Sequence, residues 1–139
     1  MSSRTMKWGG MMAGRLSATI NLIGTKTSVR RARHFTQDLL GRDHPAADDV
    51  ILVVSELVTN SITHSCSGRQ GTVPLTIDSS DNAVRVEVTD EGSAYSSPYI
   101  RDEPDSENGR GLRIVSMLAK EWGVTHRGTT LTTWCELPF

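Results

Sequence analysis

Apolar side chains recur at every second position in several segments of the chain, which is the spacing of a strand with one buried face. These segments are residues 16–23, 72–78, 84–89 and 131–137. Turn-forming residues at 79–82 separate the middle two segments, which predicts an antiparallel hairpin. A further strand begins near Trp122, turns at Gly128 and leads into the last segment.

Other segments have the three-to-four-residue apolar spacing of helices. The first predicted helix begins near residue 27 and stops at Gly41. The second, residues 46–64, is apolar on more than half of its circumference, so we expect it to be largely buried. The third opens at residues 109–111.

The order of these elements is helices, a hairpin, a helix and a final hairpin. It predicts an α+β fold, a two-layer α/β sandwich with helices on one face of a mostly antiparallel sheet. The opposite sheet face has no predicted cover, so it faces water or a second subunit. Residues 91–108 contain two prolines and an acidic run, which predicts a long loop of the kind that forms lids. Residues 1–14 contain three glycines and are expected to be a disordered arm, which leaves one domain over 15–139.

The composition agrees with one folded domain. The chain has 139 residues, 37% of them hydrophobic and 22% charged, and a net charge of −1. This balance gives no general electrostatic reason to bind nucleic acid or an anionic membrane. Three arginines near residue 31 form one small basic patch, which we interpret as the solvated face of a helix.

Two cysteines, Cys66 and Cys135, are too few for a disulfide scaffold or a four-cysteine zinc site. We interpret both as small apolar residues in a reducing compartment. The longest apolar run, residues 50–54, is far shorter than the roughly 20 residues that span a bilayer. We therefore expect a soluble, cytoplasmic protein without direct contacts to membrane or nucleic acid.

A polar stripe crosses the second predicted helix. Glu56, Asn60 and His64 are spaced four apart, so they lie on one side of the helix with about 6 Å of rise between neighbours. An amide oxygen can coordinate magnesium, and a carboxylate one turn away can hold or deprotonate a water. The alternative is that Glu56 and Asn60 lie at a solvent-exposed seam, and His64 is equally well explained as a cation near a helix C-terminus.

A second block follows the strand at 84–89. Asp90 can present its carboxylate to an exocyclic amine, as in adenine, while Gly92 lets the backbone approach a flat ring and Ala94 stays small. An ordinary Asp-x-Gly turn explains the same residues.

A third block, Gly109-Arg110-Gly111-Leu112, opens the last helix. Free backbone N–H groups and the helix dipole make such a place suitable for phosphate. The alternative is a glycine-rich helix start without a ligand.

In this order the three blocks resemble the N, G1 and G2 boxes of the Bergerat-fold (GHKL) ATPases, the superfamily of gyrase, histidine kinases and MutL. The amino-acid sequence at residues 53–60, 109–112, 122–124 and 132–137 is similar to that of the small anti-sigma factor serine kinases of bacteria. The similarity is greatest to the single-domain type of actinomycetes. The resemblance covers about residues 27–139.

This resemblance implies a role for each matching residue. Glu56 corresponds to the general base and Asn60 to the magnesium ligand. Asp90 corresponds to the residue that reads the adenine amino group, with Gly92 and Ala94 shaping the base pocket.

The remaining matches concern the edge of the nucleotide site. Thr132 corresponds to a threonine that supports the adenine contact through water. Gly109, Arg110, Gly111 and Leu112 correspond to the lid hinge and the backbone that meets the phosphates. His64 falls where these small kinases often have histidine.

The implied activity is that of a protein serine/threonine kinase that uses ATP and Mg²⁺. Its implied partners are a small anti-anti-sigma protein of the STAS type, which accepts the phosphoryl group, and a sigma factor, which the kinase sequesters as a homodimer. Because residues 95–108 match no strict family pattern, a binding module that regulates a partner without phosphorylating it is the alternative. A histidine kinase would also need a helical dimerisation domain, for which we see no room in the sequence.

Overall fold

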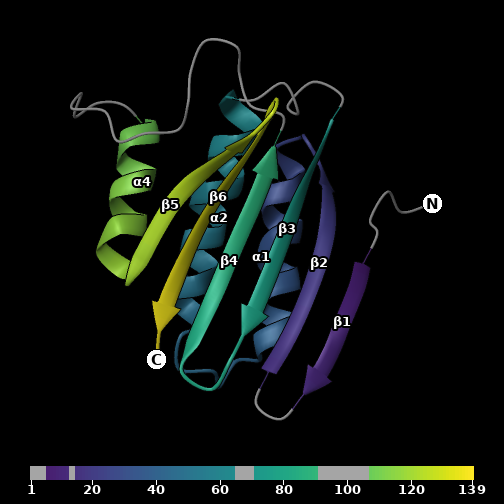
Figure 1. Cartoon of the computed structure of the whole chain (residues 1–139), viewed down its shortest axis with the longest axis vertical. Helices are drawn as coiled ribbons and strands as arrows, with labels where there is room; N and C mark the ends of the chain where they lie inside the picture. The colour runs from purple at the N-terminus through teal and green to yellow at the C-terminus, as the bar shows by residue number, and fades with distance from the viewer. Residues whose placement is uncertain (1–5, 13–14, 65–70, 91–106) are drawn as a thin grey trace.

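The computed structural model describes residues 6–12, 15–64, 71–90 and 107–139 of the chain (Figure 1). In these ranges, the strands form one six-stranded sheet in the order β1-β2-β3-β4-β6-β5, and each neighbouring pair is antiparallel. The strands are β1 (Met6–Met12), β2 (Arg15–Ile23), β3 (Thr72–Ser79), β4 (Ala83–Asp90), β5 (Glu121–Arg127) and β6 (Thr130–Pro138). The helices are α1 (Thr27–Leu40), α2 (Ala47–His64) and α4 (Glu107–Leu118).

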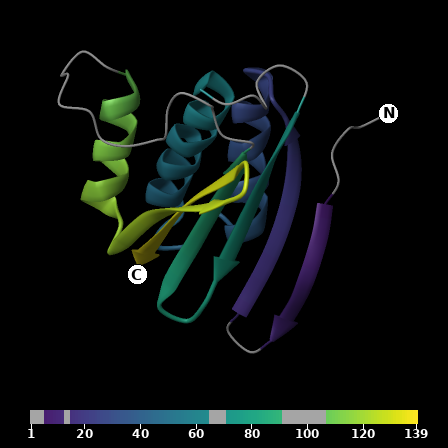
Figure 2. The same cartoon turned by 45° about the horizontal axis from the view of Figure 1, so that its top comes forward.

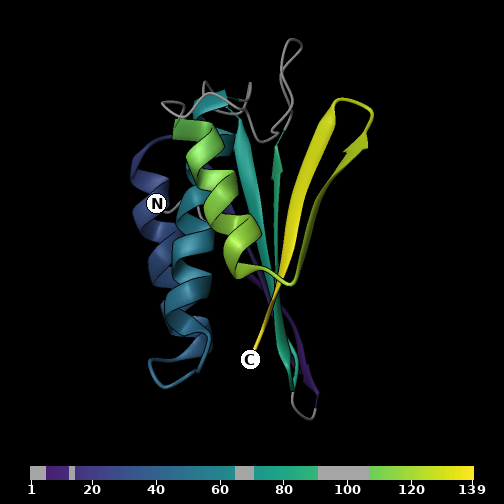
Figure 3. The same ribbon diagram turned by 90° about the vertical axis from the view of Figure 1, so that its left-hand side faces the viewer.

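The three helices lie side by side on one face of the sheet, in the order α1, α2, α4 (Figures 2 and 3). α2 contacts both α1 and α4 and also packs on β3, β4 and β6. This arrangement confirms the predicted two-layer sandwich with helices on one face of an antiparallel sheet. Within the described part of the chain, no helix has the length and apolar character needed to cross a membrane.

Every second residue of the central strands faces the helices and is buried, as the alternating pattern predicts. On β4, for example, the side chains of Val84, Val86 and Val88 are 0% exposed. α2 covers them with apolar residues from successive turns, also at 0–1% exposure: Val50, Val53, Val54, Leu57 and Val58. Burial of each such side chain contributes about 1.5–3 kcal/mol, so this interface supplies much of the stability.

The connection from α1 to α2 shows why each helix begins and ends where it does. α1 stops at Gly41, whose φ of 83° is readily adopted only by glycine. At the start of α2, the Nδ1 atom of His44 accepts a hydrogen bond from the backbone N–H of Ala46 at 3.0 Å. The His44 ring also packs edge-on against Phe139, with 4.4 Å between ring centroids, and burial lowers the pKa of His44.

Residues 6–12 form strand β1, where the sequence predicts a disordered arm. β1 pairs with the free edge of β2, with Met6 opposite Ile20 and Met12 opposite Arg15. The pairing shifts register between Trp8 and Gly10, as a bulge at a glycine does. Backbone N–H and C=O groups make this pairing, so it needs no alternating pattern in the sequence.

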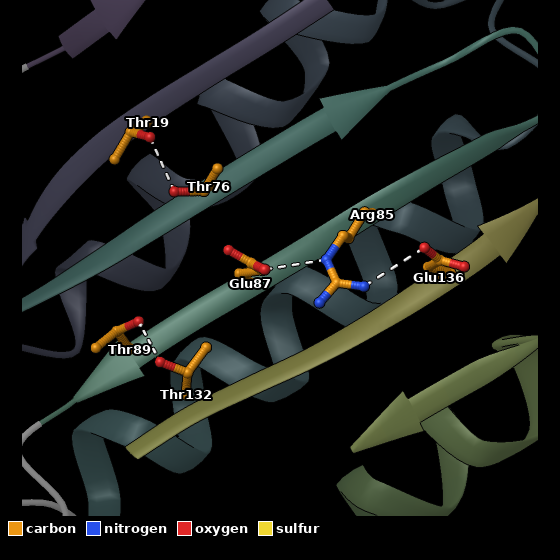
Figure 4. A network of polar contacts seen from close by, with 7 residues as sticks. All are labelled: Thr19, Thr76, Arg85, Glu87, Thr89, Thr132 and Glu136. Atoms are coloured by element: carbon orange, nitrogen blue, oxygen red, sulfur yellow. Dashed lines mark hydrogen bonds and ion pairs between the residues drawn. The ribbon is translucent and has the colours of Figure 1, made fainter. Parts of the chain in front are cut away.

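The outer face of the sheet, which no described helix covers, is polar (Figure 4). The Arg85 guanidinium contacts the carboxylates of Glu87 at 3.0 Å and Glu136 at 3.4 Å, and lies 4.4 Å from the centre of a Trp134 ring. Two pairs of hydroxyls bridge neighbouring strands: Thr19 with Thr76 at 2.8 Å and Thr89 with Thr132 at 2.9 Å. These side chains therefore bind one another between β2 and β3 and between β4 and β6.

Candidate functional site

Three elements from distant parts of the sequence end or begin at the same end of the molecule. α2 and β4 both run toward this end, which is the top of Figure 1, and α4 begins there. Described residues of each sequence block lie on these elements: Glu56 and Asn60 on α2, Asp90 at the end of β4 and Gly111 on α4. The fold thus brings these residues toward one end of the two-layer structure.

Two residues of the polar stripe on α2, Glu56 and Asn60, lie beside Gly111 of α4. Glu56 and Asn60 are both half-buried, because the helix places them beside its buried apolar side. The neighbouring hydroxyls of Ser55 and Thr59 point elsewhere, since each donates to a backbone carbonyl four residues earlier, at 2.9 and 2.6 Å. The carboxylate and the carboxamide are therefore polar groups that α2 offers to this seam.

Gly111 of α4 approaches both of these side chains. A Cβ atom placed on Gly111 would lie 2.8 Å from Oε2 of Glu56 and 3.7 Å from Nδ2 of Asn60. The residue after it, Leu112, is 1% exposed and belongs to the hydrophobic core. In the third block, Gly111 thus offers its backbone to the site, whereas the Leu112 side chain anchors the helix.

Asp90 is the last residue of β4 and is 6% exposed. It follows the buried alternation of this strand and faces the helices, which is unusual for a carboxylate. Every buried side-chain nitrogen or oxygen in the described ranges has a hydrogen-bond partner. A carboxylate held in this way at a strand end can read a hydrogen-bond donor on a ligand.

Thr132, which the resemblance implies as a helper of Asp90, lies on the wrong face of the sheet. It pairs with Thr89, and the two hydroxyls bond each other on the outer face. Successive residues of a strand point to opposite faces, so the helix-facing threonine is Thr133, which is 5% exposed. Its partner across the sheet is Val88, which makes Thr133 a diagonal neighbour of Asp90.

Sequence reasoning did not single out Thr133, although its position on the same face as Asp90 could be read from the sequence. Leu131, Cys135 and Leu137 are the buried positions of β6, and Thr133 shares their alternation. A motif match places a residue only within one or two positions along a strand, whereas the two-residue period fixes its face.

Five predicted site residues are described only in part or lie outside the described residues. Gly92 and Ala94 lie outside the described residues. His64 ends α2, and Gly109 and Arg110 lie in the first turn of α4, but the structure describes only their backbone.

The residues at this end fit a nucleotide with its magnesium ion. Oxygen atoms from an amide and a carboxylate are the ligands that Mg²⁺ prefers, and Asn60 and Glu56 supply both. Gly111 brings the α4 backbone near them without an intervening side chain. Asp90 adds a buried acceptor of the kind that recognises an amino group on a base.

Comparisons with known proteins agree with this geometry. Residues 23–134 match the histidine kinase-like ATPase domain family. Over 86 residues, which are 60% of this chain and 79% of the relative, the sequence is 35% identical to the uncharacterized protein SCO4941 of Streptomyces coelicolor.

Two solved structures have a similar fold. The crystal structure of the RsbU and RsbW domains of Rv1364c from Mycobacterium tuberculosis aligns with a TM-score of 0.66 and 22% identity, over 88% of this chain and 33% of that one. A blue-light activated histidine kinase of Erythrobacter litoralis aligns with a TM-score of 0.50 and 21% identity, over 84% of this chain and 42% of that one. This chain thus spans less than half of either protein. Because the family match covers well over half of the chain, the chain belongs to the family of histidine kinase-like ATPase domains.

Proposed function

We propose that this domain binds ATP with Mg²⁺ and transfers the γ-phosphoryl group to a serine of a partner protein. The observation that carries this proposal is the convergence of Glu56 and Asn60 on Gly111, at the end of the molecule where Asp90 is buried. The family match supports nucleotide use. The RsbW domain among the similar folds supports the comparison with anti-sigma kinases that the sequence motifs suggest.

Each residue has a role in the proposed reaction. Asp90, with Thr133 beside it, accepts a hydrogen bond from the adenine amino group. Asn60 would hold Mg²⁺, which neutralises charge on the phosphates when it is bound. The first turn of α4, ahead of Gly111, presents backbone N–H groups and the positive end of the helix dipole, which phosphate oxygens can meet.

In the proposed transfer, one bond to the γ-phosphorus forms and one breaks. The serine hydroxyl oxygen forms a bond to the γ-phosphorus, the bond from that phosphorus to the β–γ bridging oxygen breaks, and ADP leaves. Glu56 takes the proton of the serine hydroxyl. Positioning and electrostatic stabilisation supply most of the rate enhancement in reactions of this class.

For partners, we propose an anti-anti-sigma protein as the acceptor and a sigma factor as a competing ligand of a homodimer. The test is to incubate the protein with radiolabelled ATP, Mg²⁺ and each anti-anti-sigma protein of the source genome. We expect label on one of them, and no label on any of them would contradict the proposed kinase.

The nucleotide site is tested first, by calorimetric titration with ADP, ATP and GTP, each with and without Mg²⁺. We expect adenine nucleotides to bind and GTP not to bind. Asp90→Asn should weaken ADP binding by about 100-fold, because a hydrogen bond to a charged group contributes roughly 1.5–3 kcal/mol. Asp78→Asn, on the outer side of β3, is the matched control and should bind like wild type. Equal affinity of wild type and Asp90→Asn would contradict the site.

A second candidate is a binding module that captures a regulator without phosphorylating it. The observation that favours it is the absence of a strict family pattern in residues 95–108, next to α4. The two candidates differ in what Glu56→Gln does. This variant should abolish regulation by a kinase and leave regulation by a binding module unchanged.

A further inference from the structure

Gly111 lies so close to Glu56 that a side chain at this position would meet the carboxylate where it now lies. A Cβ atom on Gly111 would lie 2.8 Å from Oε2 of Glu56 and 3.6 Å from its Cβ atom. Non-bonded carbon and oxygen atoms do not approach within 3 Å without repulsion, so an alanine at this position needs the carboxylate to move.

The two helices cannot separate to make room. α4 is fixed by Leu112 and Val115, which are 1% and 0% exposed, and α2 by Val53 and Leu57, at 0% and 1%. Such buried residues are close-packed, and a displacement of either backbone would disturb the core. The Glu56 side chain is half-buried and is the movable part.

We propose that Gly111 is a positioning residue for Glu56: its missing side chain lets the carboxylate lie in the seam between α2 and α4. This role differs from the phosphate contact that the resemblance implies for the same glycine. The catalytic consequence rests on the proposed function, in which Glu56 is the base. The packing itself does not depend on that function.

A melting experiment tests the packing alone. Inside a helix, a change from glycine to alanine raises the melting temperature by roughly 3–5 °C for a domain of this size. We expect Gly111→Ala to give no such gain in the wild type, because the Glu56 carboxylate must rotate away. In the Glu56→Ala background, the same change should give the full gain.

Ser116→Ala is the matched control, since Ser116 is exposed on α4, away from this seam. It should shift the melting temperature equally in both backgrounds. If Gly111→Ala also shifts both backgrounds equally, the proposal is overturned, whether or not the protein is a kinase.

A kinetic experiment tests the consequence for the reaction. Gly111→Ala should lower the turnover number of phosphoryl transfer by about 10- to 100-fold, because a base displaced by about 1 Å loses much of its effect. Affinity for ADP should stay within about threefold of wild type. The shorter acid in Glu56→Asp makes room for the new methyl group, so Gly111→Ala should not slow the Glu56→Asp enzyme further.

The outcomes separate the two proposals. Loss of ADP affinity with an unchanged turnover number would assign Gly111 to phosphate contact instead and overturn its positioning role. If no variant and no wild type transfers phosphoryl groups, the proposed kinase fails, and the melting comparison still decides whether Gly111 positions Glu56.

Discussion

The two faces of the sheet are built from the same strands but differ in their polar side chains. On the outer face of β4 and β6, charged side chains bind one another and two hydroxyls bind each other (Figure 4). On the helix-facing side of these strands, the residues are apolar except Asp90 and Thr133, at one end. A carboxylate on this side costs free energy unless it is compensated, whereas a polar group on the outer side costs little. The helix-facing exceptions are therefore the informative residues for function.

This comparison predicts the largest effect for an apolar residue of the helix-facing side, far from the candidate site. Leu137 is 1% exposed and lies opposite Val84, near the other end of β4. Leu137→Ala should lower the free energy of unfolding by about 3 kcal/mol, measured by urea denaturation. ADP affinity of the folded protein should not change, and a large change would mean that the two ends are coupled. Leu52→Ala, at a position 42% exposed, should have a much smaller effect on stability.

An ionisable thiol buried among the apolar residues in the middle of this side should make stability depend on pH. Burial raises the pKa of the Cys135 thiol to about 12. Above pH 9 the thiol ionises in the unfolded chain but not in the folded protein. Stability from this group is therefore complete below pH 9 and falls by about 1.4 kcal/mol per pH unit above it.

Urea denaturation at pH 8 and pH 10.5 measures this loss. Wild type should lose about 2 kcal/mol more than Cys135→Val, which keeps an apolar side chain without an ionising group. The same loss in both proteins would show that other groups cause it.

The smallest effect is expected on the outer face. Arg85→Ala removes contacts to two carboxylates and the Trp134 ring, and should lower the free energy of unfolding by roughly 1 kcal/mol. The difference from wild type should shrink in 1 M salt, because salt screens half-exposed charges. Arg127→Ala, at an exposed position of β5, should change stability by less than about 0.5 kcal/mol. An Arg85 effect as large as that of Leu137 would remove the distinction between the faces.

The sequence predicted the parts of the fold that depend on local periodicity. The α2 helix and the β3–β4 hairpin have clear apolar periods, and the structure confirms both. The helix stop at Gly41 was also predictable, because a positive φ favours glycine. Local patterns of this kind are readable because each residue's environment is set by its near neighbours.

Long-range pairings could not be read in the same way. Strand β1 forms because β2 has an open edge, and its own residues have no alternating pattern. The resemblance assigned Thr132 to the wrong face, because only the register with β4 decides which threonine lies on the side of Asp90. The close approach of Gly111 to Glu56 also depends on how α4 packs against α2, which no local pattern shows.

The position of β6 in the sheet has a consequence for synthesis of the chain. β6 is the last strand in sequence, yet it lies between β4 and β5. Until its residues leave the ribosome, β4 presents an unpaired edge, which favours association with other chains. The sheet is therefore complete only once residue 138 has left the ribosome, and release before that residue would yield a species prone to aggregate.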